Sequence, residues 1–550
     1  MVDPDVAAPA RGALMATSAA VKPLGAARSM ALGTLASRTT GVVRVLVLAW
    51  VLGFSPLADA YNLANTVPNM LYDIVLGGVA TATFVPVFVE RLAIDGDRRA
   101  WRSISAVVTI STIVLVLASV LAWALAPWII DAFTALNHLS AARPAHVLSQ
   151  QRAVATSLLR WFSPQILCYG LLSLATALLN VRGRFAAPAW APITNNVVCV
   201  AVLLWFAAID PVPSLGSVSA PTSRLLLLGL GTTAGVALQA LVVAPSLVRA
   251  GALRLRWRFD LRDDAVRAVG RLSSWTLGIV VTNQIALAVV LALAFGIGGN
   301  GPVSAYTYGW AFMQMPYAVV AVSVMGAVTP ELARHWTARD SASFAQRFGT
   351  GLRGTMGIIL PAAVGLVVLA QPLVALLLYR GHGHGHLLAG TVLAVLAAGL
   401  PGFVCFQFAI RGLQSMQRAR DAFWLYVFEN GCNVAIALAI GRHSIGALTS
   451  SVSIAYSVAA VAALVVVRRR AGSLGAPGCY RPLGGIAIAS IATGVVTVLA
   501  SAATGWDTGA GLAARLAWSI AAGAITFVAC AAWLSRRSRR STGLGARGSL

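Results

Sequence analysis

The hydrophobic positions of this chain fall into long runs, separated by short segments that carry most of the charge. A helix needs about 20 apolar residues to cross the hydrocarbon core of a bilayer. Fourteen runs are long enough for us to expect transmembrane helices. They cover 29–53, 61–91, 103–131, 153–181, 188–210, 224–248, 270–297, 303–331, 353–379, 387–412, 421–441, 444–467, 482–504 and 510–535. The pattern therefore predicts an all-α polytopic membrane protein.

Composition and charge placement agree with this class. Hydrophobic residues make up 58% of the 550-residue chain and charged residues 11%, against about 25% charged in soluble proteins. The net charge of +24 would suit a protein that binds nucleic acid, but the positive charges are not clustered in one patch. Of the 41 Lys and Arg, 32 lie in alternate loops and the two tails, and only five lie in the other loops. Positive loops mark the cytoplasmic side. We expect a multi-pass protein of the cytoplasmic (inner) membrane, with both termini cytoplasmic and no nucleic-acid partner.

The spacing of the runs predicts two lobes of six helices and a C-terminal helix pair. Two similar halves are typical of transporters built from repeats, with the substrate site between them. The segment 249–269 is rich in arginine with interleaved Leu and Trp, and would lie on the inner leaflet. The expected parts are a disordered cytoplasmic tail (1–28), the N-lobe (29–248), a cytoplasmic amphipathic linker (249–269), the C-lobe (270–470), the helix pair (471–535) and a basic cytoplasmic tail on anionic membrane lipids (536–550).

Two arginines interrupt the first apolar run. Arg38 and Arg44 have no acidic neighbour in 29–53, and a charge deep in a bilayer costs at least about 2.5–3.5 kcal/mol. Six residues of helix place them roughly 120° apart and about 9 Å apart along the axis. Both can therefore line one wide cavity that binds an anionic substrate. The alternative is that Arg38 reaches the headgroups and Arg44 pairs with a carboxylate on another helix.

The second run carries a stripe of polar residues. Asp59 stands at its start, where an acid also suits the helix dipole. The spacing of the following residues places them on one helix face: Asn62, Asn65, Asn69 and Asp73. The alternative is simple polar packing between helices. Pro68, Pro86 and the pair Gly77-Gly78 predict a bent helix, as an alternating-access cavity requires.

Enzymatic motifs are absent from the sequence. It has no phosphate-binding GxxxxGK[ST] loop, no HExxH and no GxSxG, so we expect a transporter without a cofactor or metal. The histidines of GHGHGH (381–386) are interpreted as part of a solvated loop, and the six scattered cysteines as small buried residues.

Several segments resemble the MurJ/MviN family of lipid II flippases, in the multidrug/oligosaccharidyl-lipid/polysaccharide exporter superfamily. The resemblance covers roughly residues 29–470. Its N-terminal motif consists of Ser37-Arg38, Gly41, Arg44, Gly53-Phe54, Asp59-Ala60-Tyr61, Pro68-Asn69, Gly78 and Phe84-Val85-Pro86. Three further matching segments are 171–196, 315–334 and 360–381.

The resemblance implies a V-shaped bundle that opens alternately to each side of the membrane. The substrate would be lipid II, an undecaprenyl-diphosphate-linked glycopeptide, whose tail lies in a groove that includes the last two helices. Arg38 and Arg44 would hold the diphosphate, because the guanidinium group presents a fork suited to phosphate oxygens. Asn62, Asn65, Asn69, Asn283 and Gln284 would bond the sugar and peptide, and Asp59 or Asp73 would compete for the arginines at release.

The chain departs from the family at two places. Many members carry an Arg-Arg pair where this chain has Tyr72 and Asp73, and an Arg where it has Ala311. It therefore resembles a divergent member. Three alternatives follow: an exporter of another polyprenyl-diphosphate oligosaccharide, a drug/cation antiporter with an acidic cavity, or a non-transporting scaffold that recruits cell-wall synthesis or division proteins.

Overall fold

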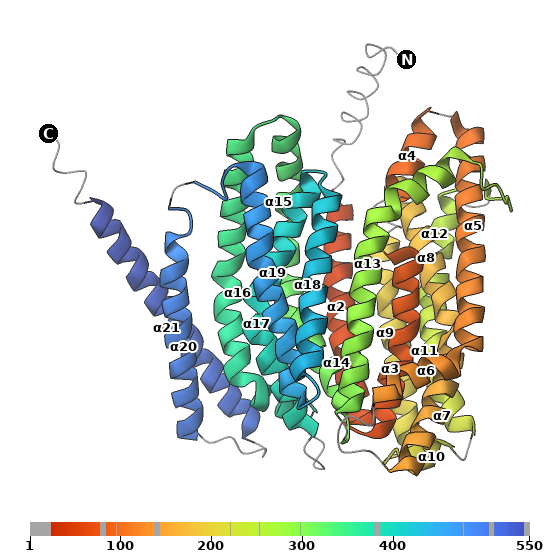
Figure 1. Ribbon diagram of the computed structural model, residues 1–550, viewed down its shortest axis with the longest axis horizontal. Coiled ribbons are helices and arrows are strands. Elements are labelled where there is room, and N and C mark those ends of the chain that lie inside the picture. Colours follow the sequence, from red (N-terminus) through yellow and green to blue (C-terminus); the bar gives the residue numbers. More distant parts are fainter. Residues whose placement is uncertain are drawn as a thin grey trace.

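The protein is a bundle of long helices that run mostly side by side, as a computed structural model shows (Figure 1). The structure describes residues 24–77, 84–94, 96–136, 144–219, 222–251, 254–297, 299–378, 385–476, 478–504 and 511–543. Within these ranges the regular elements are all helical, with no strand. The expected all-α class is confirmed.

The first half of the chain forms α2 to α12. Their bounds are α2 Leu24–Leu52, α3 Pro56–Tyr72, the π-helical turn η1 Asp73–Gly77, α4 Val85–Ile94, α5 Gly96–Ala124, α6 Ala126–Thr134, α7 Ala145–Phe162, α8 Pro164–Val181, α9 Ala186–Ile209, α10 Leu215–Ser219, α11 Thr222–Val242 and α12 Ala244–Arg249.

The second half forms α13 to α19, and two more helices follow. Their bounds are α13 Asp264–Gly296, α14 Pro302–Pro316, the π-helical turn η5 Tyr317–Ala321, α15 Val322–Thr337, α16 Ser341–Leu378, α17 Gly385–Ser415, α18 Ala419–Ile440, α19 Ile445–Ala471, α20 Arg481–Thr504 and α21 Leu512–Gly543.

Thirteen helical segments of the described chain are long and apolar enough to cross a membrane. They match thirteen of the fourteen expected spans. The remaining one, 61–91, corresponds to α3, η1 and α4, with residues 78–83 outside the described ranges. Large apolar side chains cover the outside of the bundle, among them Trp128 (67% exposed), Val461 (64%) and Ile525 (69%). Such a surface is stable only against lipid, so the protein is a multi-pass membrane protein.

Successive crossings alternate in direction, so the loops rich in arginine gather at one end of the bundle, which we call the arginine-rich end. It includes the connections α4–α5, α8–α9, α12–α13, α15–α16, α17–α18 and α19–α20. The beginning of α2 and the end of α21 lie at this end (Figure 1). The connections α2–α3 and α13–α14 lie at the opposite end.

Two groups of helices pack mainly within themselves. In the first half α2 packs on α9, α9 on α11 and α3 on α7; in the second, α17 packs on α16 and α19. The helices α13 and α14 join the groups, because α13 contacts both α5 and α18 and α14 contacts both α3 and α17. The helices α20 and α21 pack on each other and on α16, at the edge of the bundle (Figure 1).

The connection between α12 and α13 is shorter than the expected linker 249–269, because α12 ends at Arg249 and α13 begins at Asp264. Residues 254–263 are non-helical apart from one turn and lie along α5. The backbone N–H groups of Arg256 and Arg258 donate to the hydroxyls of Ser105 (3.2 Å) and Thr109 (3.1 Å). Beside this contact the Arg258 guanidinium, 2.7 Å from Asp260, lowers the pKa of that carboxyl.

Parts of the expected tails and of the histidine-rich loop lie outside the described residues, namely 1–23, 381–384 and 544–550. The predicted boundaries of the tails were wrong, because residues 24–28 form the start of α2 and residues 536–543 continue α21.

A close contact between α17 and α19 provides a test of the packing. A Cβ atom added to Gly399 would lie 2.5 Å from Cβ and 2.7 Å from Cα of Ser453, whereas one added to Gly431 in α18 would meet nothing within 4 Å. We expect Gly399→Ala to destabilise the protein by about 1–3 kcal/mol through overpacking. Gly431→Ala should be neutral or stabilising, since alanine favours helix by about 1 kcal/mol. Thermal unfolding in detergent measures both, and equal midpoints for the two variants would contradict the packing.

Candidate substrate site

The α3–α14 contact is built on a buried carboxylate. Asp59 in the first turn of α3 is fully buried and accepts hydrogen bonds from the backbone N–H (2.9 Å) and the hydroxyl (2.8 Å) of Ser304. Ser304 belongs to the first turn of α14, whose N–H groups have no partner within their own helix. Asp59 therefore binds the N-terminus of α14, whereas Ser55 caps its own helix by accepting from Ala58 N–H.

Asn62 extends this contact by one helical turn. Its amide donates to the hydroxyls of Ser304 (3.0 Å) and Tyr308 (3.3 Å). The ring of Tyr308 packs edge-on against Phe54, with 5.7 Å between centroids. Gly301 has φ = 85° and lies so close to Phe54 that a Cβ would be 2.7 Å from it. These contacts join the two halves at the end opposite the arginine-rich end.

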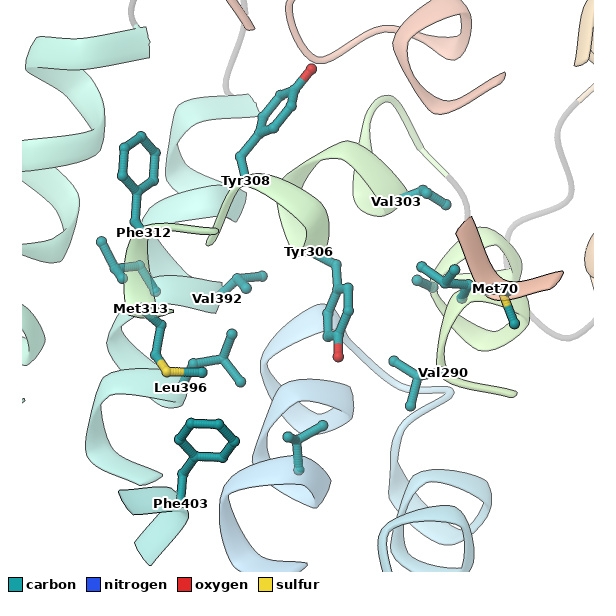
Figure 2. Close-up of a cluster of buried hydrophobic side chains, with 14 of the residues drawn as sticks. Met70, Val290, Val303, Tyr306, Tyr308, Phe312, Met313, Val392, Leu396 and Phe403 are labelled. Carbon is teal, nitrogen blue, oxygen red and sulfur yellow. The ribbon is translucent and has the colours of Figure 1, made fainter. Parts of the chain in front are cut away.

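Alternate residues of α14 point to opposite sides of that helix. Figure 2 shows Tyr308 directed away from Tyr306, which lies near Val290 of α13. Tyr308 serves the contact with α3, while Tyr306 lines a cavity of about 490 Å³ between the halves. The cavity is lined by Thr66, Asp73, Asn283, Gln284, Ala286, Leu287, Val290, Leu291, Tyr306, Thr307, Trp310, Gln314, Glu429, Asn430, Asn433, Val452 and Tyr456.

Three of the predicted site residues meet in this cavity. The amide of Gln284 donates to the Asp73 carboxylate (3.1 Å), which joins η1 to α13. Asn283 accepts from the amide of Asn430 (2.7 Å), which joins α13 to α18. Polar side chains from both halves therefore face a common space, as a site for a polar headgroup requires.

The sequence reasoning missed the contribution of α18. Glu429 is 1% exposed, and its Oε2 has no hydrogen-bond partner among the residues that the structure describes. With Asn430 and Asn433 it supplies the cavity with a polar wall from the second half. The signal was present in the sequence, because Glu429 is a charged residue inside an apolar span, like the two arginines of the first span.

The two arginines of α2 lie outside the lining of this cavity. Arg44 is half-buried and lies in the neighbourhood of Cys199, Tyr169 and Tyr61 of the surrounding helices. Arg38 is exposed, nearer the arginine-rich end, and shares the neighbourhood of Tyr317 with Arg411. Across the described chain, neither α2 arginine has a carboxylate partner within 4.0 Å.

The other two asparagines of the α3 stripe, Asn65 and Asn69, are joined by a hydrogen bond within their own helix. The amide of Asn69 donates to the carbonyl oxygen of Asn65 (2.8 Å). Tyr72, at one of the positions that departs from the family pattern, packs against Tyr169 with 5.7 Å between ring centroids. In the region of the predicted bend the regular α-helix gives way to the π-helical turn η1, which begins five residues after Pro68.

Comparisons with known proteins agree with this architecture. The family model described as lipid II flippase MurJ matches residues 48–516. The probable lipid II flippase MurJ of Rhizobium meliloti is 28% identical over 415 residues, which cover 74% of this chain and 73% of the relative. The lipid II flippase MurJ of Burkholderia cenocepacia is 27% identical over 390 residues, which cover 70% and 72%.

Solved structures show the same fold. A lipid II flippase MurJ in an inward closed conformation superposes with a TM-score of 0.74 at 19% identity, covering 92% of this chain and 99% of that chain. An inward-facing multidrug resistance MATE transporter of the MOP superfamily superposes with a TM-score of 0.63 at 14% identity, covering 79% and 95%.

The contact of Asp59 with α14 can be tested by hydrogen exchange. We expect Asp59→Ala to leave the Ser304 N–H without its acceptor, which costs about 1–3 kcal/mol. Amide exchange over residues 302–308 should then be roughly five- to 150-fold faster. Asp131→Ala is the matched control, because that carboxylate lies near the same end but is 58% exposed, 3.6 Å from Arg152. Unchanged exchange in Asp59→Ala would show that this bond does not hold the helices together.

Proposed function

Because the chain belongs to the MurJ family of lipid II flippases, we propose that it moves lipid II from the inner to the outer leaflet of the cytoplasmic membrane by alternating access. The observation that carries this proposal is Arg44, a cation in the interior of a membrane bundle without a carboxylate partner among the described residues. A guanidinium group binds phosphate oxygens through paired, charge-assisted hydrogen bonds. The diphosphate of lipid II cannot cross hydrocarbon without such a partner.

The two ends of the bundle support an alternating mechanism. At the end opposite the arginine-rich end, the halves are joined through Asp59, Asn62 and Ser304. Transport to that side requires these bonds to break, since α3 and α14 block the exit. We propose that the arginine-rich end is cytoplasmic, with both termini, and that the basic tail rests on anionic lipids near cell-wall synthesis proteins.

We assign the headgroup to the cavity between the halves. Asn283 and Gln284 of α13 would hydrogen-bond the sugar and peptide, with Asn65 and Asn69 of α3 nearby along the polar stripe. Arg38 would receive the diphosphate at the arginine-rich end, and Arg44 would hold it deeper in the bundle. The tail would remain in lipid against α20 and α21.

One observation favours a second candidate. The cavity lining contains two carboxylates, Asp73 and Glu429, and no Lys or Arg. Such a lining suits a cationic guest, as in a drug/cation antiporter of the same superfamily. Purified protein in liposomes distinguishes the two candidates. A flippase moves lipid II between the leaflets, whereas a drug/cation antiporter moves a cationic drug across the membrane and leaves lipid II in place.

Substitution of the α2 arginines tests the proposed function in cells. We expect Arg44→Ala to slow the appearance of lipid II in the outer leaflet by at least about tenfold, the effect of losing one charge-assisted bond of about 1.5–3 kcal/mol. Arg38→Ala should act in the same direction. A leaflet-accessibility assay for lipid II, in cells depleted of the native protein, measures both.

The matched control is Arg160→Ala. Arg160 is also an arginine within a span, but its guanidinium lies 5.4 Å from the ring of Trp123. It should retain transport. If Arg44→Ala is expressed at the normal level and transports like Arg160→Ala, the α2 arginines do not bind the substrate.

The two acidic residues of the α3 region test the release step. We propose that Asp59 or Asp73 replaces the diphosphate as partner of the arginines when the bundle opens outward. At least one of the variants Asp59→Asn and Asp73→Asn should then slow export while leaving lipid II binding intact. Normal export by both variants would eliminate this step.

A further inference from the structure

A basic hollow lies at the arginine-rich end, away from the cavity between the halves. It has a volume of about 560 Å³ and forms where α13, the α17–α18 turn and the end of α19 meet. The helices α18 and α19 lie side by side in the second half (Figure 1), and α13 packs on α18. The lining residues are Trp275, Gln417, Arg418, Ala419, Arg420, Asp421, Trp424 and Arg470.

The charge of this hollow is unbalanced. Its single carboxylate, Asp421, accepts two hydrogen bonds from Arg470, from Nε (3.0 Å) and from Nη2 (3.4 Å). Arg418 and Arg420 are exposed, and neither has a carboxylate partner within 4.0 Å in the described chain. Two positive charges are therefore available to an anion.

The backbone of the α17–α18 turn adds to this anion site. Gln417 has φ = 59°, a conformation that makes the turn tight and brings the first residues of α18 to the hollow. The helix α18 has 22 residues and no side-chain cap at its N-terminus. Its first N–H groups lack partners within the helix and carry the positive end of the helix dipole.

A second hollow adjoins the first and is lined by three apolar and three charged side chains. It has a volume of about 440 Å³ between α18 and α19. It shares Asp421, Trp424 and Arg470 with the basic hollow and adds Leu425, Val466 and Arg469. A ligand that fills both hollows needs an anionic head and an apolar chain. Free phosphate lacks the apolar chain, so it would occupy the basic hollow alone.

Aromatic side chains place the two hollows at the surface of the bilayer. Trp275 is 41% exposed and Trp424 is 56% exposed. The ring of Phe423 lies between them, 5.4 Å from Trp275 and 5.2 Å from Trp424. Exposed tryptophans gather at the level of the headgroups in membrane proteins, and basic pockets between spans bind anionic headgroups there.

We propose that these two hollows bind one anionic phospholipid of the adjacent leaflet. Its phosphate contacts Arg418, Arg420 and the N-terminus of α18, and one acyl chain lies along Trp424, Leu425 and Val466. The site is separate from the cavity assigned to lipid II and does not depend on the proposed function. The bound lipid holds the ends of α13, α18 and α19 together.

Lipid binding by the purified full chain tests this site. After delipidation, binding of phosphatidylglycerol and of phosphatidylcholine is measured by native mass spectrometry. We expect a clear preference for phosphatidylglycerol, and about thirtyfold weaker binding of it by the Arg418→Gln/Arg420→Gln variant, since each of the two arginines near the bilayer surface contributes about fivefold. The matched control is Arg98→Gln/Arg99→Gln, which removes two exposed arginines from the same end, in the first half.

Each outcome decides the proposal. Loss of the preference in Arg418→Gln/Arg420→Gln alone, with an unchanged thermal midpoint, supports it. Equal weakening in the Arg98→Gln/Arg99→Gln control overturns it in favour of unspecific charge attraction. Displacement of phosphatidylglycerol by equimolar glycerol 3-phosphate also overturns it, because the acyl chain would then contribute nothing. Lipid binding is read directly, so failure of this proposal is distinguishable from failure of transport.

Discussion

The bond between Asp59 and the N-terminus of α14 fixes the relation of the two halves. Burial of a carboxylate in a membrane bundle is costly unless its oxygens receive hydrogen bonds, and Ser304 donates two hydrogen bonds to Asp59. Since α3 packs within the first half and α14 within the second, this bond sets the position of one half against the other. The closed end and the cavity beside it both follow from this placement.

The two helices that meet there share one structural feature, a proline followed by a π-helical turn. In α3, Pro68 precedes the π-helical turn η1; in α14, Pro316 directly precedes the π-helical turn η5. Proline removes a backbone hydrogen bond and π-helical turns accommodate the disturbance, often at functional sites. The matching defects occupy the second crossing of each half, as a transporter built from two repeats would have them.

The sequence predicted the spans because their cause is local. Apolar runs and the arginine asymmetry follow from the bilayer itself, so thirteen helices lie where the hydropathy placed them. The partner of Asp59 was beyond such reasoning, since Ser304 is 245 residues away and looks ordinary in sequence. The sequence was enough to place Arg44 within the first span. Its neighbours Tyr61 and Tyr169 depend on how the helices pack, which the sequence pattern does not show.

The helix α13 contacts both halves of the protein. Its N-terminal cap, Asp263, accepts a hydrogen bond from Ser103 of α5, and the preceding segment is bonded along the same helix. Farther along, Gly278 lies against Phe423 of α18, with no room for a Cβ. The alternating motion proposed above would therefore require α13 to bend or to give up its contacts with α5 or α18, so this helix limits how far the halves can separate.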